Sequence, residues 1–292
     1  MINFKKSALV IAHPDDEILW FSSIINKVDK IIIVFNRTND EKVLYGREKI
    51  ITKGLLPYKD RIICLNIEEA NVFNKSDWKF PKLTSYGVRV NSYKYKNNFN
   101  QIKLKLAEEL KDYKNIITHN PWGEYGHEEH TQIFKVIEKI SYELNFIVWV
   151  SGYFSEQSYR IMTLFKNLID DEFCRLNIDY EFCEKIRNIY IFNKAWTWSK
   201  DYEWPQQETF FKLKSNFYNL EVEATKTPKI WSQMNFILMY HVHLTKLSVI
   251  RGKIIQFLEL IIPNYFFKLL VKTKNKKQKI KIKLYAKTFK LY

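Results

Sequence analysis

Short apolar runs rich in β-branched residues recur through the first half of this 292-residue chain, and a helical pattern follows most of them. The runs cover residues 7–11, 30–35, 61–65, 115–119 and 146–150. The helical patterns cover residues 17–26, 41–54, 100–113 and 128–144. Strands that alternate with helices predict an α/β fold, with a doubly wound and mostly parallel sheet over residues 1–150.

The second half of the chain is less regular. Residues 152–235 contain helical stretches and an aromatic segment at 195–205, with no clear linker or repeat before them. We therefore predict one domain over residues 1–240, with its motif-bearing core at 5–150, and a C-terminal extension of helical or mixed structure at 241–292. The Asn-, Lys- and Tyr-rich residues 68–98 are predicted to be a long excursion over the sheet.

The net charge of +15 belongs mainly to the C-terminal end. Residues 241–292 contain thirteen Lys or Arg and a single acid, Glu259, whereas the first 240 residues contain 34 basic and 31 acidic side chains. A nearly neutral body argues against a nucleic-acid partner. The hydrophobic content of 46% and the aromatic content of 16% indicate a folded core.

Three scattered cysteines, Cys64, Cys174 and Cys183, are too few for a disulfide framework and suit a reducing cytoplasm. The N-terminal apolar run has no small-residue cleavage site and leads into charged residues, so we interpret it as a strand and not as a signal peptide. No run reaches the roughly 18 apolar residues of a membrane-spanning helix. We expect a cytoplasmic protein.

The first apolar run ends in the segment Ala12-His-Pro-Asp-Asp-Glu17. In open α/β sheets, ligands bind at the carboxyl ends of the strands. An imidazole and three carboxylates are costly to bury there unless a positive charge compensates them, and a divalent metal is the obvious candidate. The segment lacks the Gly-x-Gly-x-x-Gly pattern, so a dinucleotide is not the expected ligand.

A second polar segment, Thr118 to His130, also follows a strand and opens a helix. His127 and His130 are three residues apart and can share a helix face, and His13 and Asp16 have the same spacing. Three ligands of the His/Asp type with an open position describe a catalytic zinc site. A carboxylate that is not a ligand can take a proton from metal-bound water, and Asp15 suits that role.

The two segments together resemble the LmbE-like family of N-acetylglucosaminyl-phosphatidylinositol de-N-acetylases. The resemblance covers residues 5–150. It implies a Rossmann-like, three-layer fold and a zinc-dependent hydrolase that removes an acyl group, usually acetyl, from an amino sugar. The expected setting is bacterial surface glycan assembly or secondary metabolism, with an N-acetylated amino sugar as the substrate.

By motif position, the resemblance makes His13, Asp16 and His130 the ligands of Zn²⁺ or another divalent metal. It makes Asp15 the general base, and His127 the group that stabilises the oxyanion or protonates the leaving amine. Arg47 is the best match to the family's substrate-binding Arg. The family's Gly-rich segment is replaced here by residues 18–23, Ile-Leu-Trp-Phe-Ser-Ser, which predicts a narrowed or reshaped pocket floor.

Other features have two interpretations. The aromatic segment at 195–205 either stacks on a sugar ring or packs in the core, and core packing is the commoner outcome. His119 is interpreted as a supporting residue at a strand end, and His241 and His243 receive no role. The apolar residues 254–271 and the Lys-rich residues 272–283 suit either an anchor at the inner face of an anionic membrane or a hairpin with a solvated end.

Two further functions compete with the deacetylase. A non-catalytic, metal-binding scaffold of a glycan-assembly complex has no need of a free carboxylate beside the metal. A sugar-nucleotide transferase that holds a diphosphate through Asp15 and Asp16 has no need of His127 and His130.

Overall fold

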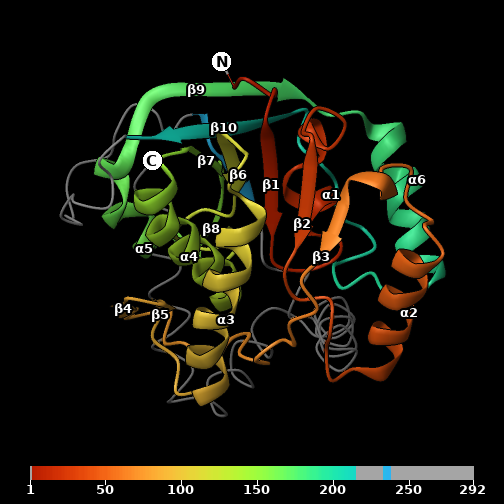
Figure 1. Ribbon diagram of the computed structural model, residues 1–292, viewed down its shortest axis with the longest axis horizontal. Coiled ribbons are helices and arrows are strands. Elements are labelled where there is room, and N and C mark those ends of the chain that lie inside the picture. The colour runs from red at the N-terminus through yellow and green to blue at the C-terminus, as the bar shows by residue number, and fades with distance from the viewer. Residues whose placement is uncertain (1, 215–232, 238–292) are drawn as a thin grey trace, which may run out of the picture. The chain divides into compact units, whose positions relative to one another are not determined.

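The computed structural model describes residues 2–214 and 233–237. Its centre is a seven-stranded sheet in the order β3-β2-β1-β6-β7-β10-β9 (Figure 1). The strands of this sheet are β1 (Ser7–Ile11), β2 (Lys30–Ile33), β3 (Ile62–Cys64), β6 (Asn115–Thr118), β7 (Ile147–Ser151), β9 (Ile169–Asn177) and β10 (Gln207–Leu213). The first five in the sheet order are parallel, and β10 and β9 add to them in antiparallel fashion. The α/β prediction is therefore confirmed.

Helices flank the sheet. The α-helices are α1 (Asp16–Trp20), α2 (Glu41–Thr52), α3 (Tyr93–Glu109), α4 (Glu128–Leu144), α5 (Tyr159–Leu164) and α6 (Tyr180–Phe192). Short 3-10 helices are η1 (Ser22–Ile24), η2 (Lys59–Arg61) and η3 (Lys166–Leu168). Helices α3 and α4 pack on each other, as do α2 and α6, and Figure 1 shows the two pairs on opposite sides of β1 to β3.

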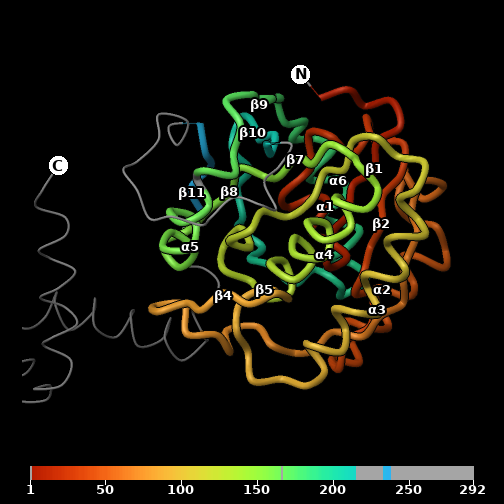
Figure 2. Tube along the Cα trace, turned by 60° about the vertical axis from the view of Figure 1, so that its left-hand side comes forward, coloured from red at the N-terminus to blue at the C-terminus, as the bar shows by residue number. Residues whose placement is uncertain are grey.

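Two small sheets complete the described part of the chain. Strands β4 (Leu83–Thr84) and β5 (Gly87–Val88) form a hairpin within the predicted excursion. Strands β8 (Tyr153–Ser155) and β11 (Asn235–Ile237) pair in parallel and lie side by side in Figure 2.

The apolar character of β1 follows from burial on both of its faces, which is usual for a central parallel strand. Ala8 and Val10 join the core cluster that also contains Leu106 of α3 and Ile137 of α4. Because side chains alternate along a strand, Leu9 points to the opposite face, where it is also fully buried. Such a strand has no solvated face, and its polar residues come only where it ends.

The helix predicted at 17–26 is shorter than expected, because α1 ends at Trp20 and η1 follows it. The backbone N–H groups and hydroxyls of Ser22 and Ser23 donate four hydrogen bonds, of 2.6–3.1 Å, to the Glu208 carboxylate on β10. These N–H groups are therefore unavailable to continue an α-helix. Helix α3 begins at Tyr93, earlier than predicted, because the Ser92 hydroxyl accepts a hydrogen bond from the N–H of Tyr95 and caps it.

The chain divides into two units, and the described residues belong to the first, Met1–Met239. The predicted extension at 241–292, with His241, His243 and the basic tail, lies outside the described residues. Within the described part, no helix is both long and apolar enough to cross a membrane. Cys64, Cys174 and Cys183 are all free thiols.

Candidate metal centre

The two polar segments of the sequence meet at one edge of the sheet. Strands β1 and β6 are parallel neighbours, so the turns that follow them lie side by side. The rings of His13 and His127 are 4.8 Å apart, and those of His127 and His130 are 4.5 Å apart, measured between centroids. These three imidazoles and the Asp16 carboxylate are all buried. The structure thus brings the three predicted metal ligands, His13, Asp16 and His130, together with His127.

Asp16 lies at the centre of this cluster. Its Oδ2 atom is 3.3 Å from His13 Nδ1 and 3.3 Å from His130 Nε2. The same oxygen accepts a hydrogen bond of 2.7 Å from the backbone N–H of His13. Three groups of side chains in the described residues have ligand atoms within 4.8 Å of one another: His13 with His127 and His130, Asp16 with His119 and His130, and His13 with Glu69 and Glu129.

Glu124 orients two of the imidazoles. Its Oε2 atom lies 2.9 Å from His119 Nδ1 and 2.7 Å from His130 Nδ1, so each ring donates its Nδ1 proton to the carboxylate. Each Nε2 atom then carries a lone pair. Burial alone would raise the pKa of Glu124, but the imidazoles of His119 and His130 hold it at about 2. A carboxylate behind a histidine is the usual support of a metal ligand.

The two Nε2 atoms have different surroundings. His119 Nε2 accepts a hydrogen bond of 2.9 Å from the N–H of Ala12, so His119 supports the turn after β1. His130 Nε2 is buried and has no hydrogen-bond partner in the described structure. A buried nitrogen lone pair that faces a carboxylate at 3.3 Å is unfavourable unless a cation lies between them. The donor set therefore fits a divalent metal.

Asp15 is turned away from this cluster. Its backbone has φ 92° and ψ −18°, a left-handed conformation that is strained for a residue other than glycine. Its Oδ2 atom accepts hydrogen bonds from the N–H and the hydroxyl of Thr197. Burial and the adjacent Asp16 raise the pKa of Asp15 to about 8. The neighbouring carboxylates thus have separate environments, as separate roles require.

Glu17 holds the start of α1 through hydrogen bonds to both of its carboxylate oxygens. Its Oε1 atom accepts hydrogen bonds from the hydroxyls of Tyr58, at 2.8 Å, and Tyr190, at 2.6 Å. Its Oε2 atom accepts the N–H of Asp15 at 3.0 Å. Glu17 thereby supports the strained Asp15 backbone and links it to α6.

His127 caps the N-terminus of α4. Its Nδ1 atom accepts the N–H of Glu129 at 3.1 Å, which leaves the ring proton on Nε2. Burial and the imidazoles of His130 and His13 hold the pKa of His127 well below its usual value. Phe73, from the excursion over the sheet, stacks on the ring at 5.0 Å. His127 is therefore a neutral hydrogen-bond donor at the site.

Arg47, the predicted substrate contact, lies on α2 and is buried. Its guanidinium pairs with Glu69 at 2.5 Å, while its Nε atom has no partner in the described structure. The charge of Arg47 also favours ionisation of Asp15, because it lowers the pKa of that carboxyl. Glu129, which sequence reasoning missed, lies 3.0 Å from His13 Nε2 and accepts the N–H of Ala70.

Carboxyl groups outnumber Lys and Arg side chains among the buried residues of the described chain. The buried carboxyl groups are Asp15, Asp16, Glu17, Glu124, Glu128, Glu129 and Glu208. Arg47 is the only buried Lys or Arg in the same set. A bound cation would favour the ionised form of the carboxyl groups near it, which agrees with the unpaired Nε2 atom of His130.

The aromatic segment at 195–205 lies against α1. Trp204 is buried and donates its indole N–H to the carbonyl of Ile18 at 2.7 Å, as core packing predicts. Trp198 is half-buried and contacts the edges of Trp20 and Tyr125, at 5.1 Å and 4.5 Å between centroids. The segment both packs on the core and borders the site.

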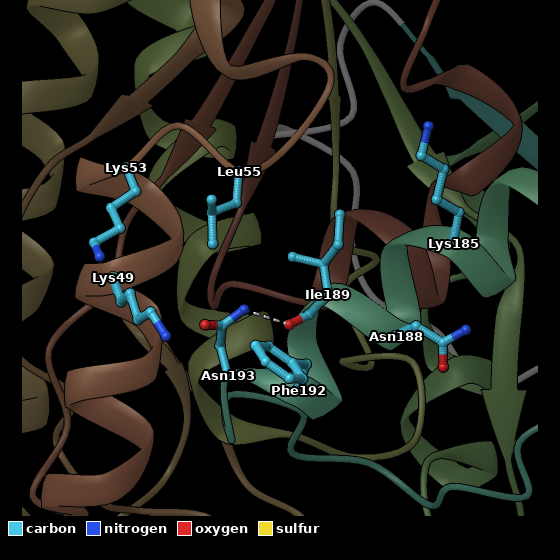
Figure 3. Close-up of a pocket in the computed structure, with 8 residues that line it drawn as sticks. All are labelled: Lys49, Lys53, Leu55, Lys185, Asn188, Ile189, Phe192 and Asn193. Atoms are coloured by element: carbon cyan, nitrogen blue, oxygen red, sulfur yellow. Dashed lines mark hydrogen bonds between the residues drawn. The ribbon is translucent and has the colours of Figure 1, made fainter.

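A groove of about 570 Å³ between α2 and α6 is a different place on the molecule (Figure 3). The residues that line it are Lys49, Lys53, Leu55, Lys185, Asn188, Ile189, Phe192 and Asn193. None of them belongs to the metal centre described above.

The comparisons with known proteins give distant similarities. No family model matches the chain. Uncharacterized protein L374 of Acanthamoeba polyphaga mimivirus is 32% identical over 143 residues, which is 47% of this chain and 56% of the viral protein. The chain thus spans little more than half the length of that curated relative.

Several solved structures to which the chain is similar are described as deacetylases. The zinc-inhibited form of teicoplanin deacetylase Orf2 has 11% sequence identity and a TM-score of 0.45, over 71% of this chain and 98% of that one. The A40926 pseudoaglycone deacetylase Dbv21 has 11% identity and a TM-score of 0.42, and the match covers 75% of this chain and 100% of that one. A deacetylase in complex with teicoplanin has 10% identity and a TM-score of 0.39, and the match covers 71% of this chain and 97% of that one.

Proposed function

We propose that this protein is a metal-dependent hydrolase that removes an acetyl or related acyl group from the nitrogen of an amino sugar. The observation that carries the proposal is the division between Asp15 and Asp16. Asp16 faces the imidazole nitrogens, whereas Asp15 is held apart by Thr197. The two motifs that resemble the LmbE-like de-N-acetylases supply the same assignment, and we infer membership of that family.

The metal is Zn²⁺ or another divalent ion, held by His13, Asp16 and His130. When bound, such an ion lowers the pKa of water toward ~7 and polarises the substrate carbonyl. Glu124 fixes the His130 ring, and Glu129 fixes the His13 ring at its outer nitrogen.

The remaining residues move protons. Asp15 accepts a proton from the attacking water, whose oxygen bonds to the amide carbonyl carbon. His127, whose ring proton is on Nε2, donates a hydrogen bond to the developing oxyanion. The proton that Asp15 took from water passes to the leaving nitrogen. The C–N bond breaks, and the products are a carboxylic acid and a free amine, so that one water is consumed for each amide. Arg47 contacts the substrate or, through Glu69, supports this edge of the site.

Metal analysis and acetate release test the proposal. The purified protein is expected to hold about one equivalent of a divalent metal. A panel of free N-acetyl sugars, nucleotide-linked sugars and lipid-linked sugars is then screened for acetate. Asp15→Ala is expected to lose at least 100-fold in turnover while it retains the metal. Metal loss in that variant would mean that the roles of Asp15 and Asp16 are misassigned.

The proposal extends to the basic tail. Residues 241–292, outside the described part of the chain, provide a peripheral contact with the inner face of an anionic membrane. Sedimentation with anionic vesicles is compared for the full chain and for a chain truncated before Lys253. Equal binding of the two proteins would remove the tail from the proposal.

A further inference from the structure

Trp20 lies one helical turn after the metal ligand Asp16. The two residues are the last and the first of α1, so their side chains share a face of that helix. The indole is fully buried, and its Nε1–H donates a hydrogen bond of 3.1 Å to Asp16 Oδ1. Trp20 belongs to the segment 18–23, which replaces the Gly-rich segment expected from the family resemblance.

This hydrogen bond determines which way the Asp16 carboxylate faces. Oδ1 is directed to Trp20, and Oδ2 receives the N–H of His13 and faces the nitrogens of His13 and His130. A rotation of the carboxylate about its Cβ–Cγ bond would break the bonds to both donors. The indole thereby keeps Oδ2 in the position from which it can bind an ion.

The indole itself has little freedom to move. Four aromatic rings contact it, with centroid distances of 5.1–5.8 Å. The contacts with Tyr153, Trp198 and Tyr202 are edge-to-face, and the ring of Tyr125 is tilted. Two of the four, Trp198 and Tyr202, come from the aromatic segment. The orientation of the donor is therefore set by a rigid cluster that spans both halves of the chain.

We propose that Trp20 is a positioning residue that fixes the Asp16 carboxylate for the metal. The inference deepens the proposed function and rests on its metal site, although not on its substrate. Phenylalanine at this position would keep much of the aromatic packing and remove only the donor. Removal of the donor should therefore lower the affinity for the metal while the protein still folds.

The test measures the affinity for Zn²⁺ by competition with a chromophoric chelator, in the full chain. Trp20→Phe is expected to bind Zn²⁺ roughly 10-fold to 100-fold more weakly than the wild-type protein. Trp149→Phe is the matched control, because Trp149 on β7 is also buried and its indole nitrogen has no hydrogen-bond partner in the described structure. The control should change the affinity by less than about 3-fold.

A second measurement needs no folded variant. Wild-type protein labelled with ¹⁵N at its eight tryptophan side chains is titrated with Co²⁺, and the indole N–H signals are followed by NMR. One indole signal should broaden or shift far more than the rest, because the Trp20 nitrogen lies 3.1 Å from a ligand carboxylate. If no indole signal responds to a bound ion, the proposal is overturned.

The outcomes separate this proposal from the proposed function. If the wild-type protein binds Zn²⁺ and folded Trp20→Phe binds it equally well, the positioning role is wrong and the hydrolase proposal stands. If Trp20→Phe binds Zn²⁺ weakly but no amino sugar releases acetate, the hydrolase proposal fails and the positioning role stands.

Discussion

Thr197 donates two hydrogen bonds to a single oxygen of Asp15. Its backbone N–H and its hydroxyl lie 2.8 Å and 2.7 Å from Oδ2. The two residues come from opposite ends of the described chain, after α6 and after β1. Because Oδ2 is occupied in this way, the other oxygen of Asp15 is the one available to a water molecule. The base of the proposed reaction is thus held by a residue that neither motif contains.

Thr197→Val should therefore slow the reaction without removing the metal. The variant loses one hydrogen bond to a charged group, which contributes about 1.5–3 kcal/mol and corresponds to roughly a 10-fold to 100-fold fall in turnover. Thr197→Ser keeps the hydroxyl and serves as the control. Acetate release and Zn²⁺ affinity are measured side by side. A fall in metal affinity equal to the fall in turnover would contradict a role that acts through Asp15.

Glu124→Gln should weaken metal binding roughly 10-fold to 100-fold, because the amide has no negative charge behind His119 and His130 and has one acceptor oxygen, whereas Glu124 accepts hydrogen bonds on both oxygens. Glu138→Gln is the control, since Glu138 on α4 is only half-buried and pairs with Lys135. Competition with a chelator measures both variants. Equal affinities in the two would show that Glu124 does not orient the ligand.

The free energy of unfolding of the metal-free protein should depend on pH through Glu124, and Glu124→Gln tests this. The pKa of Glu124 is held at about 2, below the ordinary value of about 4.3 in an unfolded chain. A depressed pKa stabilises the fold above the unfolded value, and this stabilisation is lost as the pH falls from about 4.3 toward 2. The difference in unfolding free energy between wild type and Glu124→Gln should shrink over that window. A constant difference in urea titrations would contradict it.

Metal removal should lower the thermal stability of the whole chain. An ion that binds only the folded state, at 100 times its dissociation constant, adds about 2.7 kcal/mol to the unfolding free energy. Calorimetry with and without a chelator measures the change, and Asp16→Asn should abolish it. An unchanged melting temperature on saturation with Zn²⁺ would argue against a site in the folded protein.

Two thiols should resist alkylation in the native protein. Burial raises the pKa of both Cys64 and Cys183 to about 12, so their thiolate fraction at pH 8 falls on the order of 1000-fold below that of a free cysteine. Iodoacetamide labelling followed by mass spectrometry measures the rate at each site. Urea-unfolded protein provides the control, in which the cysteines should react rapidly.

The parts of the fold that depend on local pattern could be predicted from the sequence. β1 is confirmed at residues 7–11, because its β-branched run is buried on both faces, and α4 is confirmed at 128–144, where its apolar residues follow the helical period. The polar turns after β1 and β6 meet because parallel neighbours end at the same sheet edge. This rule was enough to bring His13 and His130 together.

The parts that depend on distant contacts could not be predicted. Helix α1 ends where Ser22 donates hydrogen bonds to Glu208, which is far along the chain. The residues around Ser22 do not indicate this contact. The antiparallel strands β9 and β10 lie in a region whose hydrophobic pattern is irregular, so the sequence did not predict them. Glu124 lies within the second motif, so a search for a carboxylate near the motif's histidines would have found it. Thr197 lies in neither motif, and no sequence pattern indicates its contact with Asp15.

The four hydrogen bonds from Ser22 and Ser23 to Glu208 have a consequence for biosynthesis. A nascent chain that has emerged as far as residue 150 already carries His13, Asp16 and His130, but it lacks the carboxylate that ends α1. It also lacks Thr197 and the Tyr190 hydroxyl that hold the turn before α1. The turn that carries Asp15 and Asp16 can therefore reach its described geometry only after β10 has left the ribosome, so a site that depends on this geometry would be completed late in synthesis.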